Sequence, residues 1–191
     1  MLGMPSWSVV GLPDASIKES TERVRTAIKN SGYEFQSRKI VVNLAPANTK
    51  KEGSFFDLPI AIGILVNFEE IRRQNLENTV FIGELSLDGE LNHISGVLPM
   101  CIEARRLKMK RIILPQKNAK EASIVEGIEV IGVENLRQVV QYLNGKKAIS
   151  PVRASIEEFF QKQKQYPFDF SEVKGQENVK RAIEVAAARW S

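Results

Sequence analysis

The pattern of hydrophobic and polar positions is most informative between residues 39 and 66, KIVVNLAPANTKKEGSFFDLPIAIGILV. Residues 40–44 are rich in β-branched side chains, which predicts a strand. A polar loop over 48–54 separates this strand from an apolar segment that begins at Asp57. We expect a helix there, with Asp57 as its N-cap and Pro59 in its first turn. Apolar side chains cover nearly every face of that helix, which predicts that it is buried.

The rest of the chain alternates between segments of strand and of helix periodicity. A strand at 7–10 precedes a helix that we expect to be capped by Asp14 and to end at Ser31 and Gly32. Further along the chain, the same signals predict strands at 80–82, 111–114 and 129–133, and helices at 98–107, 119–125 and 134–143.

Residues 83–91, GELSLDGEL, carry the best hairpin signal in the chain. Asp88 and Gly89 are residue types that adopt the two positive φ values of a tight turn, and leucines alternate with polar residues on both sides. A hairpin requires an antiparallel strand pair. Because strands and helices also interleave, the sequence predicts an α+β fold. We expect a two-layer mixed sheet with helices on one side, in preference to a doubly wound parallel sheet.

Composition narrows the class of protein. The chain has 191 residues, of which 43% are hydrophobic and 26% charged, which fits one globular domain of ordinary size plus an appendage. Cys101 is the one cysteine and His93 the one histidine, which excludes a disulfide framework and offers no clustered ligands for a metal. No apolar run approaches the ~18 residues of a membrane helix, so we expect a cytoplasmic protein without a membrane partner.

The net charge is +4, and the densest basic run is RRLKMKR at 105–111. This run has two interpretations. Cations are favoured at the C-terminal end of a helix, so the run fits a solvated helix end. A patch that contacts phosphate groups is the alternative.

Signatures of catalysis are weak. A P-loop needs G-x-x-x-x-G-K-[ST], and the nearest match, 144–147, lacks the first glycine and the hydroxyl. No G-x-S-x-G elbow is present, and no carboxylate spacing makes His93 part of a triad. A Ser–Lys dyad stays open, because Ser54 lies near Lys50 and Lys51 in the chain. Neighbours in a loop seldom reach the required geometry, so solvated loop charges are the simpler interpretation of the two lysines.

A change of composition marks a boundary near residue 145. Residues 146–166 are polar and rich in lysine and glutamine, which predicts a linker with a short helix at 156–160. The segment 167–191 leads into an amphipathic helix but is too short to form a core alone. We therefore predict a first domain over 1–145 and the truncated start of a second module over 167–191.

Four segments, VVGLPDASIKES, VNLAPANTKKEG, FDLPIAIGIL and FIGELSLDGEL, resemble in order and spacing the N-terminal domain of the magnesium-chelatase-like AAA+ ATPases of the ComM/YifB type. The tail FDFSEVKGQENVKRAIEVAAA resembles the start of the AAA+ module that follows in that family. The resemblance implies a ribosomal-protein-S5-domain-2-like fold, shared with the proteolytic domain of Lon and the C-terminal domain of RadA-type repair proteins. It also implies that the family's first strand or two precede this chain and that its Walker A loop would follow.

The Lon pattern allows the reactive positions to be compared. Residues 52–55, EGSF, fall where Lon has its nucleophile loop, with Phe55 at the serine position and Ser54 one place off. Residues 93–98, HISGVL, fall on the segment of the catalytic lysine, and Leu98 holds the lysine position. A leucine accepts no proton, so the resemblance implies that the fold is kept and the protease dyad is not.

The resemblance thus implies a non-catalytic accessory domain of a DNA-acting motor, a helicase for branch migration in recombination or transformation. Such a domain would serve ring assembly, DNA engagement or both. Two alternatives stay open: a residual Lon-like peptidase that uses Ser54, and a magnesium chelatase subunit. The predicted phosphate contacts are Lys50, Lys51, Arg105, Arg106, Lys108, Lys110 and Arg111.

The resemblance also implies the cofactors and partners of the parent protein. We expect no cofactor in this chain, and ATP with Mg²⁺ in the parent, an ATPase in which Val173, Gly175 and Gln176 would contribute to nucleotide binding. The parent would form hexamers through its AAA+ module. We therefore expect the chain alone to be monomeric or weakly associated, with DNA as the macromolecular partner.

Overall fold

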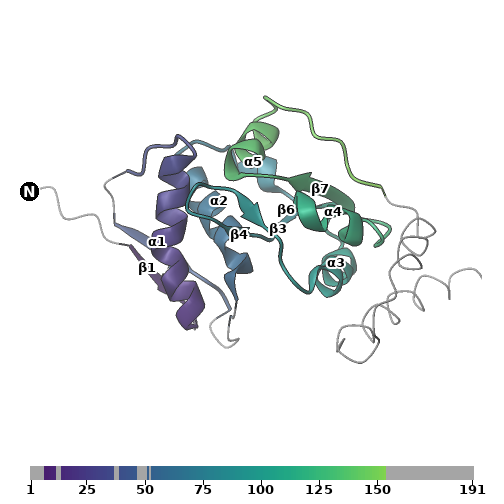
Figure 1. Ribbon diagram of the computed structural model, residues 1–191, viewed down its shortest axis with the longest axis horizontal. Coiled ribbons are helices and arrows are strands. Elements are labelled where there is room, and N and C mark those ends of the chain that lie inside the picture. Colours follow the sequence, from purple (N-terminus) through teal and green to yellow (C-terminus); the bar gives the residue numbers. More distant parts are fainter. Residues whose placement is uncertain (1–6, 12–13, 37–38, 47–50, 52, 154–191) are drawn as a thin grey trace, which may run out of the picture.

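The computed structural model of the protein describes residues 7–11, 14–36, 39–46, 51 and 53–153. A first group of elements lies at the left of Figure 1, where the two long helices α1 and α2 run side by side. This group comprises β1 (Trp7–Val10), α1 (Ala15–Asn30), β2 (Ile40–Asn43), the 3₁₀ turn η1 (Ser54–Phe56) and α2 (Asp57–Asn67).

A second group forms the right half of the described fold in Figure 1. Its strands are β3 (Thr79–Phe81), β6 (Arg111–Pro115) and β7 (Glu129–Val133), and its helices are α3 (Val97–Arg106), α4 (Gln116–Ala122) and α5 (Leu136–Leu143). A 3₁₀ turn, η2 (Arg73–Leu76), precedes β3, and a hairpin of β4 (Glu84–Leu85) and β5 (Leu91–Asn92) follows it.

The chain begins with a β–α–β unit, as the sequence predicts. β1 and β2 are parallel, with Trp7 opposite Ile40. The Asp14 carboxylate caps α1, because it accepts a hydrogen bond from Ile17 N at 2.8 Å. The helix ends one residue before Ser31, and Gly32 follows with φ +88°. Both the predicted cap and the predicted end of α1 are confirmed.

Helix α2 is buried, as its composition predicts. Leu58, Ala61 and Leu65 are fully inaccessible to solvent. The predicted cap is wrong, however. Phe56 occupies the N-cap position without a side-chain hydrogen bond, and Asp57 is the first residue of the helix. The Asp57 carboxylate instead turns toward α1 and the hairpin. It accepts hydrogen bonds from Arg23 on α1 and from Leu85 N on the hairpin, not from the first turn of its own helix.

The hairpin is present, but its turn differs from the prediction. Gly89 has φ +86°, whereas Asp88 is not among the described residues with a positive φ. Gly89 N donates to Ser86 O at 3.0 Å and Ser86 N donates to Glu90 O at 2.9 Å, so a turn is followed by a left-handed glycine. A Cβ at position 89 would also lie 2.3 Å from Ser31 Oγ, so both conformation and space require glycine here.

The second sheet is parallel, with strand order β3–β6–β7. Side chains of β6 alternate between two cores. Ile113 packs in a core with α1, α2 and α5, while Ile112 and Leu114 pack in a core with α3 and α4. Helices therefore flank both faces of this sheet, as is usual for parallel strands. The predicted α+β class is confirmed, but the expected placement of helices on one side does not hold for this sheet.

The described fold continues past residue 145, where we predict the first domain to end. Val152 N donates to Val130 O at 2.8 Å, so the first residues of the predicted linker 146–166 contact the domain. The predicted helix at 156–160 and the predicted second module at 167–191 lie outside the described residues.

Candidate functional site

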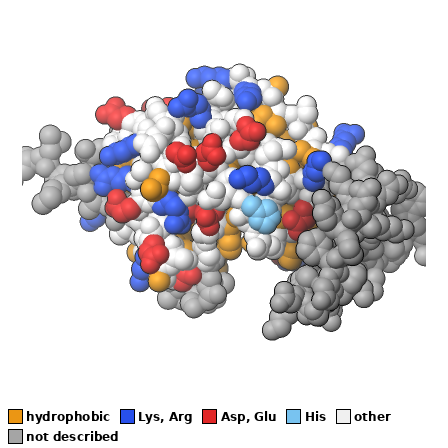
Figure 2. Space-filling model, in the orientation of Figure 1, with side chains coloured by type: hydrophobic (Ala, Val, Ile, Leu, Met, Phe, Trp, Pro, Cys, Tyr) orange, Lys and Arg blue, Asp and Glu red, His pale blue; other side chains and the backbone are white. Residues whose placement is uncertain are grey.

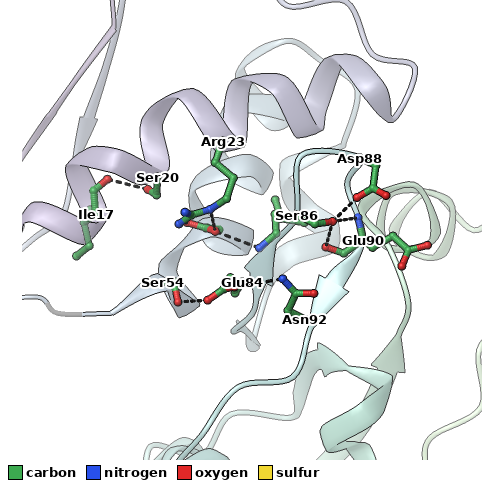
Figure 3. A network of polar contacts seen from close by, with 11 residues as sticks. Ile17, Ser20, Arg23, Ser54, Glu84, Ser86, Asp88, Glu90 and Asn92 are labelled. Atoms are coloured by element: carbon green, nitrogen blue, oxygen red, sulfur yellow. Dashed lines mark hydrogen bonds and ion pairs between the residues drawn. The ribbon is translucent and has the colours of Figure 1, made fainter.

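An ion pair joins α1 to α2 beside the segment that resembles the Lon nucleophile loop. The fully buried Asp57 carboxylate accepts hydrogen bonds from Arg23 Nε at 2.8 Å, from Arg23 Nη2 at 3.1 Å and from Leu85 N at 3.0 Å (Figure 3). Burial raises the pKa of Asp57, and the hydrogen bonds from Arg23 and Leu85 partly oppose this rise. The hydrogen bond to Asp57 in turn raises the pKa of Arg23. One carboxylate thus ties α1, α2 and the hairpin together.

Ser54, the low-probability nucleophile of the sequence, is bonded to a carboxylate. Its Oγ donates a hydrogen bond to Glu84 Oε2, and the other oxygen of Glu84 accepts from Asn92 Nδ2 at 3.1 Å (Figure 3). Ser54 begins η1, while Glu84 and Asn92 face each other across the hairpin. The hydroxyl proton therefore points to a carboxylate on β4, and an amide holds that carboxylate in place.

The lysine and histidine that the sequence offers as bases lie away from Ser54, as does the Leu98 position. The Lys51 side chain is 7% exposed, and its Nζ donates to Pro46 O. Leu98 is 3% exposed and packs in the core between α3 and α4, while His93 is exposed beyond the hairpin. Within the described residues, neither an amine nor an imidazole is hydrogen-bonded to Ser54. Lys50 lies outside the described residues.

The one cysteine of the chain is also a poor candidate for a nucleophile. Cys101 is fully buried on the inner face of α3. Burial raises the pKa of the Cys101 thiol to about 12, and the charge of Glu121 adds to the rise. At neutral pH this thiol is therefore protonated and poorly nucleophilic.

The cations of the basic run 105–111 differ in whether another residue of the fold accepts a hydrogen bond from them. Arg106 donates two hydrogen bonds to Glu103, at 2.7 and 2.6 Å, on the exposed side of α3. Arg105 Nη1 donates to Glu126 O at 3.3 Å. These contacts leave both guanidinium groups at the surface but supply each with a protein partner.

Arg111 has a structural position rather than a surface one. Its Nε donates to Thr79 Oγ1 at 2.6 Å and its Nη1 to Tyr142 OH at 3.4 Å, and the guanidinium lies 5.5 Å from the Tyr142 ring centroid. A further hydrogen bond reaches Asn75 O. Arg111 therefore ties β6 to β3, η2 and α5. Like Lys51, it is a predicted phosphate contact whose cation the fold itself engages.

Lys108 and Lys110 are exposed on the turn between α3 and β6. They line a hollow of about 560 Å³ together with Gly127. An adjoining hollow of about 400 Å³ shares Lys110 and Gly127 and reaches Arg153. We call this surface the α3–β6 groove; its charged lining residues are Arg105, Lys108, Lys110, Arg153, Glu126 and Glu129. No side-chain hydrogen bond joins either lysine to another described residue.

The face shown in Figure 2 carries charges of both signs. Over the face shown in Figure 2, Lys and Arg side chains are interspersed with Asp and Glu. The described residues contain no group of three or more His, Cys, Asp or Glu side chains that could hold a metal ion. Within the same ranges, no helix is both long enough and apolar enough to cross a membrane. The predicted nucleotide contacts Val173, Gly175 and Gln176 lie outside those ranges.

Sequence patterns did not indicate the polar network around Asp57. Arg23 and Asp57 are 34 positions apart, and Ser54 and Glu84 are 30 positions apart, so no local spacing relates them. The one available signal was a carboxylate at the start of an otherwise apolar helix. That residue type has an obvious local use as a cap, which conceals its tertiary partner.

Comparison with known proteins gives a consistent assignment. Residues 1–118 match the family described as subunit ChlI of Mg-chelatase. The chain is 38% identical over 190 residues to the competence protein ComM of Haemophilus influenzae, a match that covers 97% of this chain and 36% of ComM. The chain thus spans about a third of the length of that relative.

Two shorter matches concern the fold. Lon protease 2 of Bacillus subtilis is 30% identical over 125 residues, which covers 64% of this chain and 22% of the protease. The DNA repair protein RadA of Halalkalibacterium halodurans is 33% identical over 119 residues, 62% of this chain and 25% of RadA. The Lon match agrees with the observed α+β architecture and its Lon-like fold. Because the family match covers more than half of the chain, this protein belongs to the Mg-chelatase-like ChlI family, which includes ComM.

Proposed function

We propose that this chain is a non-catalytic accessory domain of an Mg-chelatase-like AAA+ protein and that it contacts the phosphate backbone of DNA through the α3–β6 groove. In this proposal the parent protein is a DNA-acting motor in the cytoplasm. ATP hydrolysis with Mg²⁺ and hexamer formation would reside in the AAA+ module of the parent, and Val173, Gly175 and Gln176 of this chain would contribute to its nucleotide site.

The environment of Ser54 supports a role without catalysis. A serine nucleophile needs a base that removes its proton and a desolvated site in which the base is positioned. Here the lysine of a Ser–Lys dyad does not reach Ser54: the buried amine of Lys51 donates to Pro46 O, and Leu98 packs in a core. The Ser54 hydroxyl donates instead to Glu84, which Asn92 also binds. This arrangement does not favour the peptidase alternative. The chelatase alternative has no metal-binding cluster in the described residues to support it.

The observation that carries the DNA proposal is the pair of exposed ammonium groups in the α3–β6 groove. Lys108 and Lys110 have no side-chain hydrogen bond to the described part of the fold, so their charges are available to a ligand. Arg105 and Arg153 line the same groove and extend it along the surface. The names of ComM, a competence protein, and of RadA, a DNA repair protein, agree with a nucleic-acid partner.

The test is a titration of the 191-residue chain against fluorescently labelled single- and double-stranded DNA, followed by anisotropy at several salt concentrations. Each phosphate contact contributes about −0.9 to the slope of log K against log salt for a duplex. Lys108→Glu combined with Lys110→Glu is expected to weaken binding at least tenfold and to reduce that slope by about 2.

Lys18→Glu combined with Lys29→Glu is the matched control, because both lysines are exposed on α1 and the net charge changes equally. This control should retain most of the affinity. The proposal fails if the wild-type chain does not bind at low salt. It also fails if the control pair weakens binding as much as the groove pair, because binding would then report net charge alone.

A further inference from the structure

Helices α1, α2, α3 and α5 end in the same way, with a residue in the left-handed region after the C-cap. In α3, Lys108 N donates to Arg105 O at 2.9 Å. Met109 N donates to Ala104 O at 3.0 Å, and the two bonds together form a Schellman motif. The equivalent pair of bonds closes each of the other three helices. Glycine is the usual residue at the left-handed position, because it has no Cβ.

The chain has glycine at two of these positions and a charged residue at the other two. Gly32 follows α1 and Gly145 follows α5, with φ +88° and +70°. Glu69 follows α2 and Lys108 follows α3, with φ +63° and +58°. A residue with a side chain adopts this conformation at a free-energy cost that glycine does not have. Glycine at positions 69 and 108 would therefore give more stable helix ends.

The surroundings of Glu69 offset this cost. Glu69 lines a hollow of about 670 Å³ where the C-terminal ends of α1, α2 and α5 meet. Three cations line the same hollow, and Glu70 supplies the other carboxylate; the cations are Arg72, Arg137 and Lys146. Opposite charges attract one another, so the charge of Glu69 contributes to the stability of the fold.

The surroundings of Lys108 add to the cost. Lys108 shares its part of the α3–β6 groove with the cations Arg105 and Lys110, and Glu129 is the one carboxylate among the described residues that line it. Like charges repel one another. In the free chain, an ammonium group at position 108 is therefore unfavourable both for its backbone conformation and for its charge. Lys110 shares the charge but not the conformation, because its φ is not positive.

We infer that Lys108 is retained for a ligand and not for the fold: it sets the affinity of the α3–β6 groove for closely spaced phosphate groups, and it lowers the stability of the free chain. Duplex DNA carries one negative charge per ~1.7 Å of helix axis, so a bound backbone replaces repulsion among the groove cations by attraction. Residues held in costly conformations cluster where a binding site requires their side chains. The inference rests on the proposed function, which names the DNA backbone as the ligand.

The test compares Lys108→Gly with Glu69→Gly, which changes the same backbone position outside the groove. Lys108→Gly should raise the midpoint of thermal unfolding of the 191-residue chain by about 2 °C, and Glu69→Gly should raise it less, because Glu69 loses its attraction to nearby cations. Lys108→Gly should also weaken binding to a labelled duplex at least about threefold at low salt, and should reduce the slope of log K against log salt by about 1. Glu69→Gly should not weaken binding.

Two further variants separate charge from conformation. Lys18→Ala removes an equal charge from the exposed side of α1 and should leave the affinity within about twofold of wild type. Gly145→Ala adds a side chain to the left-handed position after α5, where a Cβ meets no atom within 4 Å. This change should lower the midpoint by about 2 °C through conformation alone.

The outcomes distinguish this inference from the proposed function. A wild-type chain that does not bind the duplex at low salt overturns the proposed function itself. Binding that Lys108→Gly leaves unchanged overturns only the inference, since other cations then set the affinity. A midpoint that Lys108→Gly does not raise also overturns it, because position 108 then carries no cost. So does an equal loss of affinity in Lys18→Ala, which would report net charge, or an unchanged midpoint in Gly145→Ala.

Discussion

The Ser54 region and the α3–β6 groove contain similar polar residue types, but the fold engages them differently. Around Ser54, the hydroxyl donates to the Glu84 carboxylate, Asn92 donates to the same carboxylate, and Arg23 is paired with Asp57. In the groove, the ammonium groups of Lys108 and Lys110 are exposed. The difference shows that a polar residue near a motif is available to a ligand only when no other residue of the fold is hydrogen-bonded to it. We therefore propose binding at the groove and a structural role for the Ser54 region.

The largest expected effect tests whether the Ser54 region is structural. Asp57→Ala leaves Arg23 and Leu85 N without their acceptor, so we expect a loss of about 3 kcal/mol in unfolding free energy. This value is at the lower end for a buried pair, because the Arg23 side chain is 27% exposed. Urea unfolding followed by circular dichroism measures it. Asp88→Ala, on the exposed hairpin turn, removes only the acceptor of the Ser86 hydroxyl; it is the control and should shift the unfolding midpoint far less than Asp57→Ala.

A second comparison separates the two ends of the basic run. Arg111→Ala removes the hydrogen bonds to Thr79 and Tyr142 and the packing against the Tyr142 ring, so we expect a loss of about 2 kcal/mol. Arg106→Ala removes only an exposed pair with Glu103 and should not shift the midpoint of urea unfolding. Equal effects of the two changes would remove the distinction between the structural Arg111 and the surface Arg106.

The smallest expected effect is a pH dependence. Burial raises the pKa of Asp57, so the folded state binds more protons than the unfolded state between the two pKa values. The contribution of this carboxyl to stability is then largest at low pH and falls as the pH rises through the folded pKa. We expect the difference in unfolding free energy between wild type and Asp57→Asn to shrink as the pH rises above about 4, the ordinary pKa of an aspartate. A difference that grows with pH would show that Arg23 outweighs burial.

Local patterns predicted most of the secondary structure because the signals were strong and short in range. Strand β7 occupies the predicted residues 129–133, and α1 begins at the predicted cap, Asp14. The sequence did not predict that helices cover both faces of the β3–β6–β7 sheet. The Asp88–Gly89 hairpin indicated an antiparallel pair, but it carried no information on which faces of the parallel strands are buried. The turn prediction failed because the Asp–Gly pair is a signal both for a two-residue turn and for a turn followed by one left-handed glycine.

The site was predictable only in part, because partners far apart in sequence decide which groups are free. The basic run 105–111 was recognisable, but its sequence does not show that Arg111 reaches Thr79 and Tyr142. Lys51 likewise looked like a solvated loop residue and is 7% exposed. The predicted contacts Lys108 and Lys110 are exposed, and their role as phosphate contacts stays a prediction.

The central claim is that this domain keeps a Lon-like fold without its reaction, and hydrolysis of a fluorescently labelled unstructured polypeptide tests it most directly. The wild-type chain and Ser54→Ala are compared at equal concentration against a blank without protein. We predict that both rates equal the blank, because the Ser54 hydroxyl donates to Glu84 and no amine among the described residues bonds to it. Hydrolysis by the wild type that Ser54→Ala abolishes would contradict the account.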